Sequence, residues 1–147
     1  MRIEEKLCNK FPAVLREKLL SGEIELPDTA MFEYEKIRTY RAVKREEKDF
    51  HEVTRDDFKS YYECGQMPKN PRGRGDVKKD PTYYGVSSFL KKEIVEQIMK
   101  FPNPHKKMAV GYIYSEGGPQ KTDSDRGHVC WWLYEAADVS GFKLMGE

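Results

Sequence analysis

The segment YYGVSSFL, residues 83–90, decides how this sequence is interpreted. Aromatic and β-prone residues lead through a glycine to two hydroxyl groups, and an apolar stretch of helical period follows. We predict a strand over Tyr83–Val86, an N-cap at Ser87 or Ser88, and a helix that ends before Pro102. Such a junction places hydroxyls and free backbone N–H groups at one edge of a sheet, where ligands commonly bind.

Working outward from this segment, hydrophobic periodicity predicts an α+β fold with a mainly antiparallel sheet and with N-terminal and central helices. A helical segment occupies residues 1–30 and is expected to stop at Gly22. The capping pattern after Thr54 predicts a short helix. The strands are expected at Met31–Val43, Tyr83–Val86, Met108–Tyr114, His128–Tyr134 and Phe142–Met145, with loops at 65–81 and 117–127.

Length and composition limit the class of protein. A chain of 147 residues fits a single domain, residues 1–147, and its many aromatic residues can fill one core. Because 26 basic residues nearly balance 25 acidic ones, no overall attraction to nucleic acid or to an anionic membrane is expected. No stretch approaches the roughly 20 apolar residues that span a bilayer, so no membrane association is expected.

Cysteine usage points to a reducing compartment. Cys8, Cys64 and Cys130 have no paired spacing, which argues against a disulfide framework and a zinc site. The charged N-terminus lacks the apolar core of a secretory signal. We therefore expect a cytoplasmic protein that holds no metal.

Three polar residues on different predicted elements are candidates for chemistry. Arg41 shares a strand face with Ile37 and Val43, so it needs either a structural partner or an anionic ligand. Ser87 can cap the following helix or hold a ligand. Glu135 follows an aromatic strand, where a carboxylate can stabilise a developing cation or remain a solvated strand end.

These three residues, in this order along the chain, resemble the arginine–serine–glutamate branch of the ADP-ribosyltransferase fold. The resemblance implies that Arg41 holds the phosphates of NAD, that Ser87 orients the nicotinamide ribose, and that Glu135 promotes loss of nicotinamide. The catalytic set would then be Arg41, Ser87 and Glu135. The family carries a glutamate or glutamine where Leu133 stands, so transfer to an acceptor is less favoured than cleavage.

Three further residues are candidates for binding the cofactor. Tyr84 resembles the stacking aromatic of the fold's other branch, Ser88 neighbours Ser87, and His128 begins a late strand. A structural role for His128 stays open, because strand-edge histidines commonly have one. NAD is thus the expected substrate, with a protein or a nucleic acid as acceptor.

The alternative is a non-catalytic accessory module, of the phage or mobile-element type, that binds a protein or a nucleic acid. The loop over residues 65–81 is basic and includes Arg72 and Arg74. Tyr83 and Tyr84 would offer stacking faces beside it for single-stranded nucleic acid. A dimer formed through an exposed edge strand is a third possibility.

Overall fold

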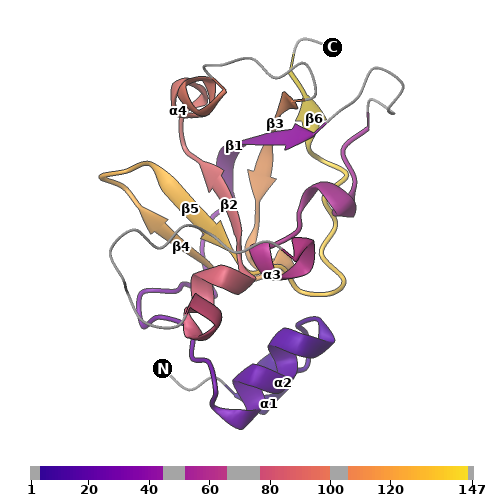
Figure 1. Ribbon diagram of the computed structural model, residues 1–147, viewed down its shortest axis with the longest axis vertical. Helices are drawn as coiled ribbons and strands as arrows, with labels where there is room; N and C mark the ends of the chain where they lie inside the picture. The colour runs from indigo at the N-terminus through magenta and orange to yellow at the C-terminus, as the bar shows by residue number, and fades with distance from the viewer. Residues whose placement is uncertain (1–3, 45–51, 66–76, 100–105, 146–147) are drawn as a thin grey trace.

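The computed structural model describes residues 4–44, 52–65, 77–99 and 106–145 (Figure 1). Within them lies one sheet in the order β4-β5-β2-β1-β3-β6, with every neighbouring pair antiparallel. The expected α+β class with a mainly antiparallel sheet is therefore confirmed. The strands are β1 (Ile37–Lys44), β2 (Val86–Phe89), β3 (Lys106–Ile113), β4 (Gln120–Asp123), β5 (His128–Trp131) and β6 (Lys143–Leu144).

Short helices surround this sheet. The α-helices are α1 (Glu5–Cys8), α2 (Ala13–Ser21), α3 (Tyr61–Cys64) and α4 (Lys92–Ile98), and the 3₁₀ turns are η1 (Arg55–Asp57), η2 (Val77–Lys79), η3 (Pro81–Tyr84) and η4 (Ser115–Gly117). Figure 1 shows α1 and α2 together at one end of the molecule and α4 at the opposite end. No helix in the described ranges is both long and apolar enough to cross a bilayer.

The N-terminal helical segment breaks where its proline falls. Pro12 has no N–H for a continuous helix and instead becomes the N-cap of α2. Gly22 ends α2 in the left-handed region, with φ of 80°, so the expected stop is confirmed. Thr54 and Asp57 form the expected capping box, but the turn that they start is the 3₁₀ turn η1, and α3 begins only at Tyr61.

Two hydrophobic cores lie on opposite sides of β5. Val129 and Trp131 belong to one core, which also contains residues of β1, β3 and β6. Cys130 and Trp132 belong to the other, which contains the N-terminal helices. The residues of this strand thus alternate between the two cores, and this alternation fixes which face the N-terminal helices cover. The strand itself ends at Trp131, three residues earlier than expected.

The interpretation of residues 83–90 was wrong in its boundaries. Tyr83 and Tyr84 lie in η3, and the strand begins at Val86. Ser87 and Ser88 are strand residues opposite Cys130 and Val129, so neither caps α4. Gly85 explains the shift, since a Cβ there would lie 2.3 Å from the Cys130 sulfur, and only glycine lets the chain enter the sheet this close to β5.

The region expected to be a loop at 117–127 contains β4, a strand that the prediction missed. Its residues are polar and lack an apolar alternation, but they pair with all of β5. Gly118 leads into this hairpin with φ of 137°, and a Cβ there would lie 2.0 Å from the Trp132 carbonyl oxygen. Tertiary pairing therefore forms this strand against its local preference.

The sheet opens between β1 and β2. These strands pair at a single position, Tyr40 with Phe89, whereas β1 pairs with β3 along its whole length. Beyond Tyr40, the two strands separate. On the side toward β1, the backbone of β2 at Ser87 is therefore not paired with a strand, whereas on its other side Ser87 pairs with Cys130 of β5.

Candidate functional site

A cavity of about 290 Å³, called here the Arg41 cavity, lies where β1 and β2 separate. It is bounded by the end of β1, the start of β2, the segment 56–64 and the first residue of β3. Its lining residues are Arg41, Ala42, Val43, Lys44, Asp56, Asp57, Lys59, Tyr61, Cys64, Gly85, Ser87 and Lys106. Two of the three predicted catalytic residues, Arg41 and Ser87, are thus brought together.

The Arg41 guanidinium is held in a fixed position. Its Nε donates to the Asp57 carbonyl oxygen at 2.9 Å, and its Nη1 donates to the Ser87 carbonyl oxygen. The guanidinium carbon lies 5.8 Å from the centre of the Phe58 ring. Burial lowers the pKa of Arg41, but a guanidinium still keeps its charge at neutral pH. A permanent, oriented positive charge therefore stands at the wall of the cavity.

Among the described residues, cations outnumber carboxylates around this cavity. Arg41, Lys44, Lys59 and Lys106 line it, against Asp56 and Asp57. The Asp57 carboxylate accepts a hydrogen bond from the Thr54 N–H at 2.9 Å, and the Asp56 carboxylate lies 3.7 Å from the Lys59 ammonium. Even with both acids counted, four cations face two carboxylates, so the cavity suits an anionic ligand.

Ser87 directs its hydroxyl to His128 on the neighbouring strand. The Ser87 Oγ and the His128 Nε2 are 3.0 Å apart. Burial lowers the pKa of His128, and the nearby positive charge of Arg126 lowers it further. The imidazole is therefore neutral at pH 7. His128 thus contacts one of the cavity residues but does not itself line the cavity.

Ser88 lies on the other face of β2. Its side chain is buried, and its hydroxyl finds no hydrogen-bond partner among the described residues. Ser88 is not among the residues that line the Arg41 cavity.

Glu135 is separated from this arrangement. Its side chain is exposed, its N–H donates to the Lys10 carbonyl oxygen at 2.8 Å, and its own carbonyl oxygen accepts from Arg55. It lines neither of the two cavities described here. The structure therefore does not bring Glu135 together with Arg41 and Ser87.

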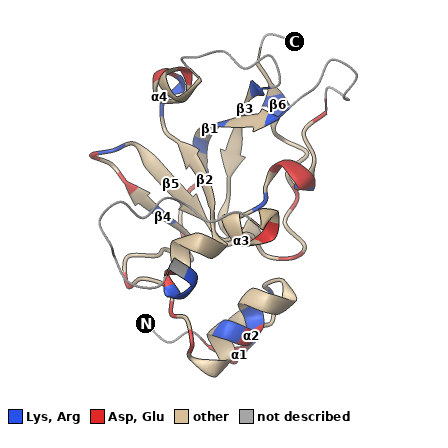
Figure 2. Cartoon of the chain, viewed as in Figure 1, with Lys and Arg blue, Asp and Glu red and all other residues tan. Residues whose placement is uncertain are grey.

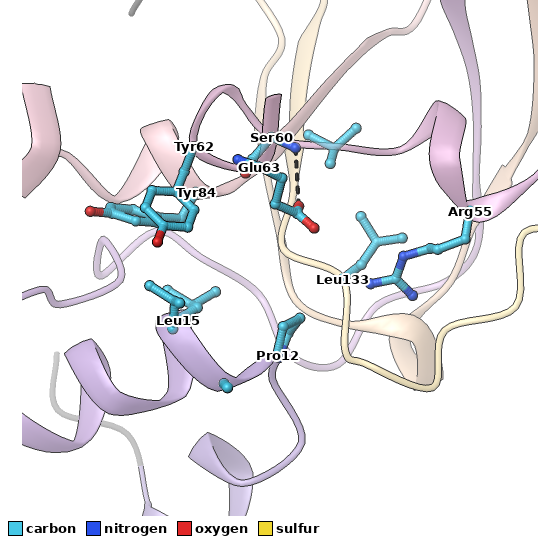
Figure 3. Close-up of a pocket in the computed structure, with 11 residues that line it drawn as sticks. Pro12, Leu15, Arg55, Ser60, Tyr62, Glu63, Tyr84 and Leu133 are labelled. Carbon is cyan, nitrogen blue, oxygen red and sulfur yellow. Dashed lines mark hydrogen bonds between the residues drawn. The ribbon is translucent and has the colours of Figure 1, made fainter. Parts of the chain in front are cut away.

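A second cavity, of about 210 Å³, lies between α2, α3 and the sheet (Figure 3). We call it the Tyr84 cavity, after the predicted cofactor-binding residue that lines it. Its other lining residues are Pro12, Ala13, Val14, Leu15, Arg55, Ser60, Tyr62, Glu63, Val86 and Leu133. The Tyr84 ring lies 5.3 Å from the Tyr62 ring, and its hydroxyl donates to the Lys78 carbonyl oxygen at 2.8 Å.

The burial of Tyr83 and Tyr84 corrects one expectation. Their exposed fractions are 6% and 7%, so neither ring offers an open stacking face to a nucleic-acid strand. Both rings belong instead to the core that contains the N-terminal helices. Residues 66–76, which hold Arg72 and Arg74 of the expected basic loop, lie outside the described residues.

One wall separates the two cavities. Within the segment 55–64, Arg55, Ser60, Tyr62 and Glu63 line the Tyr84 cavity, while Asp56, Asp57, Lys59, Tyr61 and Cys64 line the Arg41 cavity. On β2 and the residues before it, Tyr84 and Val86 face the first, and Gly85 and Ser87 face the second. Both segments thus contribute side chains to two adjacent cavities, and residues 84–87 alternate between them.

Sequence reasoning missed most of the charged residues in these cavities. Arg55, Lys59 and Glu63 carried no motif that singled them out. The one available signal was the capping-box pattern from Ser60 to Glu63, in which each residue's side chain accepts the other's backbone N–H. That pattern predicts a helix start but not which cavity the carboxylate faces.

Within the described residues, no group of three histidine, cysteine or acidic side chains is arranged to hold a metal.

Comparison with known proteins identified no protein similar to this chain. The chain matches no protein-family model, no curated protein and no solved structure.

Proposed function

We propose that this protein binds a phosphate-bearing ligand in the Arg41 cavity. The observation that carries the proposal is the excess of cations around a guanidinium that two backbone carbonyls hold in place. The remaining nitrogen of Arg41, Nη2, has no hydrogen-bond partner among the described residues. Planar guanidinium groups and mobile lysines together are a common means of holding phosphate oxygens.

The size of the cavity limits the part of the ligand that it takes. Its 290 Å³ is slightly below the roughly 300–1,000 Å³ of pockets that enclose drug-sized ligands. It has room for a phosphate with an attached sugar, with the rest of a larger molecule outside. NAD, which the resemblance to ADP-ribosyltransferases implies, is one such ligand.

Thermal unfolding of purified protein with inorganic phosphate, AMP, ADP-ribose or NAD tests this proposal. We expect a saturable rise in Tm with the nucleotides, because a ligand that binds only the folded state stabilises it by mass action. The double substitution Lys59→Gln and Lys106→Gln removes two cavity cations and should strongly reduce the rise. Lys92→Gln on α4, an exposed lysine outside the cavity, is the matched control. No rise with any of the four compounds would remove the proposal.

Cleavage of NAD is a finer proposal. It would use Arg41 for the phosphates, Ser87 for the ribose, and Glu135 to stabilise the cationic transition state electrostatically. The exposed position of Glu135 requires that the nicotinamide end of the dinucleotide extend out of the cavity. Release of nicotinamide from NAD, followed for the wild type and for Glu135→Gln, tests it. Binding without release would leave the protein as a binding module.

A second candidate, nucleic-acid binding, is favoured by one face of the sheet. Cross-strand pairing places nine residues on this face, none of them buried and none acidic: Arg38, Tyr40, Ala42, Lys44, Lys106, Met108, Val110, Tyr112 and Lys143. Lys36 lies over the Tyr112 ring at 4.7 Å, and Arg38 over the Tyr40 ring at 5.7 Å. Figure 2 shows basic but no acidic positions on β1, β3 and β6.

Cations beside aromatic rings suit single-stranded nucleic acid, whose phosphates and bases they can contact together. If this candidate is correct, the protein binds a labelled oligonucleotide with an affinity that falls steeply as salt rises. Arg38→Gln and Tyr112→Ala should each weaken that binding, whereas Lys92→Gln should not. Absent or salt-insensitive binding would eliminate this candidate and leave phosphate-bearing small molecules.

A further inference from the structure

Two opposite charges line the Tyr84 cavity without pairing with each other. Nη1 of Arg55 donates to the carbonyl oxygens of Glu135 and Ala137, at 3.3 Å each, which leaves Nε and Nη2 available. The Glu63 carboxylate accepts from the Ser60 N–H through Oε1 at 3.1 Å, which leaves Oε2 available. Each charged group is thus held in place on one side, and its remaining polar atoms have no partner among the described residues.

The rest of the cavity is largely apolar. Figure 3 shows the Glu63 carboxylate and the Arg55 guanidinium extending toward the part of the cavity that Leu133 lines. Leu15 and Pro12 form the wall on the α2 side, and the Tyr62 and Tyr84 rings lie together at one end. An acid and a base therefore project beside a hydrophobic and aromatic surface.

The volume of this cavity limits how much of a ligand it can enclose. Its 210 Å³ is well below the roughly 300–1,000 Å³ typical for drug-sized molecules. Its lining also differs from that of the Arg41 cavity, because one arginine and one carboxylate stand here beside apolar residues, whereas four cations line the other cavity. A compound with few heavy atoms would fit inside whole.

We infer that the Tyr84 cavity binds a free α-amino acid with an apolar or aromatic side chain. Arg55 receives the carboxylate, Glu63 receives the ammonium, and the side chain packs against Leu133, Leu15 and the tyrosine rings. Both charged ends are needed, because each one makes its own charge-assisted hydrogen bond, and a ligand with a single charged end would make only one of the two. A polypeptide terminus carries only one of the two charges and so fits less well.

Three probes that share the same benzyl group test the inference. They are L-phenylalanine, N-acetyl-L-phenylalanine, which lacks the ammonium, and L-phenylalaninamide, which lacks the carboxylate. Calorimetric titration of the full chain should show binding of L-phenylalanine, with each derivative at least about tenfold weaker, since one charge-assisted contact is lost. Undetectable binding of L-phenylalanine, or equal binding of all three probes, would overturn the inference.

Two substitutions locate the binding within this cavity. Glu63→Gln keeps the capping box, because glutamine can serve at that position, but it removes the charge that holds the ammonium. In this variant, L-phenylalanine should bind no better than its N-acetyl derivative. Arg55→Gln should likewise abolish the preference for L-phenylalanine over its amide. Unchanged preferences in both folded variants would contradict the assignment.

Lys59→Gln is the matched control, because Lys59 lies on the same segment but faces the Arg41 cavity. It should bind L-phenylalanine as the wild type does. The two proposals can therefore fail separately, since loss of nucleotide binding leaves amino-acid binding unaffected, and the reverse.

Discussion

Arg41 on β1 donates a hydrogen bond to the backbone carbonyl of Ser87 on β2, in the gap where the two strands no longer pair. A partly buried carbonyl that no neighbouring strand pairs needs a donor, and the guanidinium supplies it. The same group also binds the Asp57 carbonyl oxygen at 2.9 Å. Arg41 thus joins three segments of the chain while its charge faces a cavity.

Replacement of Arg41 should therefore cost stability as well as binding. In Arg41→Gln, at least one of the two carbonyls loses its donor, and we expect the free energy of unfolding to fall by about 2–3 kcal/mol. Arg41→Lys should recover only part of this loss, because an ammonium lacks the planar fork of donors. Urea denaturation at pH 7 measures both variants. A change below about 0.5 kcal/mol, the usual size for surface substitutions, would contradict the structural role.

Ser88→Ala should stabilise the protein. The buried Ser88 hydroxyl has no partner among the described residues, so its removal relieves an unsatisfied polar group. We expect the free energy of unfolding to rise by about 1 kcal/mol, with ligand binding unchanged. Ser87→Ala is the matched comparison, because it removes the contact with His128 and should not stabilise. Loss of nucleotide binding in Ser88→Ala would restore Ser88 as a cofactor-binding residue.

Protonation of His128 should make stability depend on pH. Burial lowers its pKa from the ordinary value of 6.5, so as the pH falls below 6.5 the unfolded chain takes up a proton that the folded protein does not. The free energy of unfolding should therefore fall through this window and level off below the folded-state pKa. In His128→Gln this part of the dependence should disappear. Parallel pH profiles for wild type and variant would contradict the shifted pKa.

Much of the sheet could be predicted from the sequence, because its strands alternate clearly. The alternation of Val129 and Trp131 with Cys130 and Trp132 indicated a strand with two different faces, and in the structure the two pairs belong to two different cores. The strand β4 could not be predicted, since its polar residues gain their order from pairing with β5. Likewise, Ser87 and Ser88 have the local signature of a helix cap, and only tertiary pairing makes them strand residues.

The candidate site could be predicted only in part. The pattern around Arg41 indicated a half-buried arginine that needs partners, but those partners are backbone carbonyls at positions 57 and 87, which no side-chain motif reveals. Arg55 and Glu63 line one cavity, although most of the residues between them line the other, because the short irregular segment 55–64 contributes side chains to both. The cavity that each of these side chains lines depends on how the segment 55–64 packs against α2 and β2.

The thiol of Cys64 provides the most direct test of ligand binding in the Arg41 cavity. Cys64 is exposed and lines that cavity, whereas Cys8 and Cys130 are buried, and burial raises the pKa of Cys130 to about 12. Iodoacetamide, an uncharged reagent, should therefore alkylate Cys64 first in the folded protein. With NAD or ADP-ribose at about ten times its Kd, roughly nine-tenths of the sites are occupied, and the alkylation rate should fall about tenfold. A rate that stays constant up to millimolar concentrations of both compounds would contradict phosphate-ligand binding in this cavity.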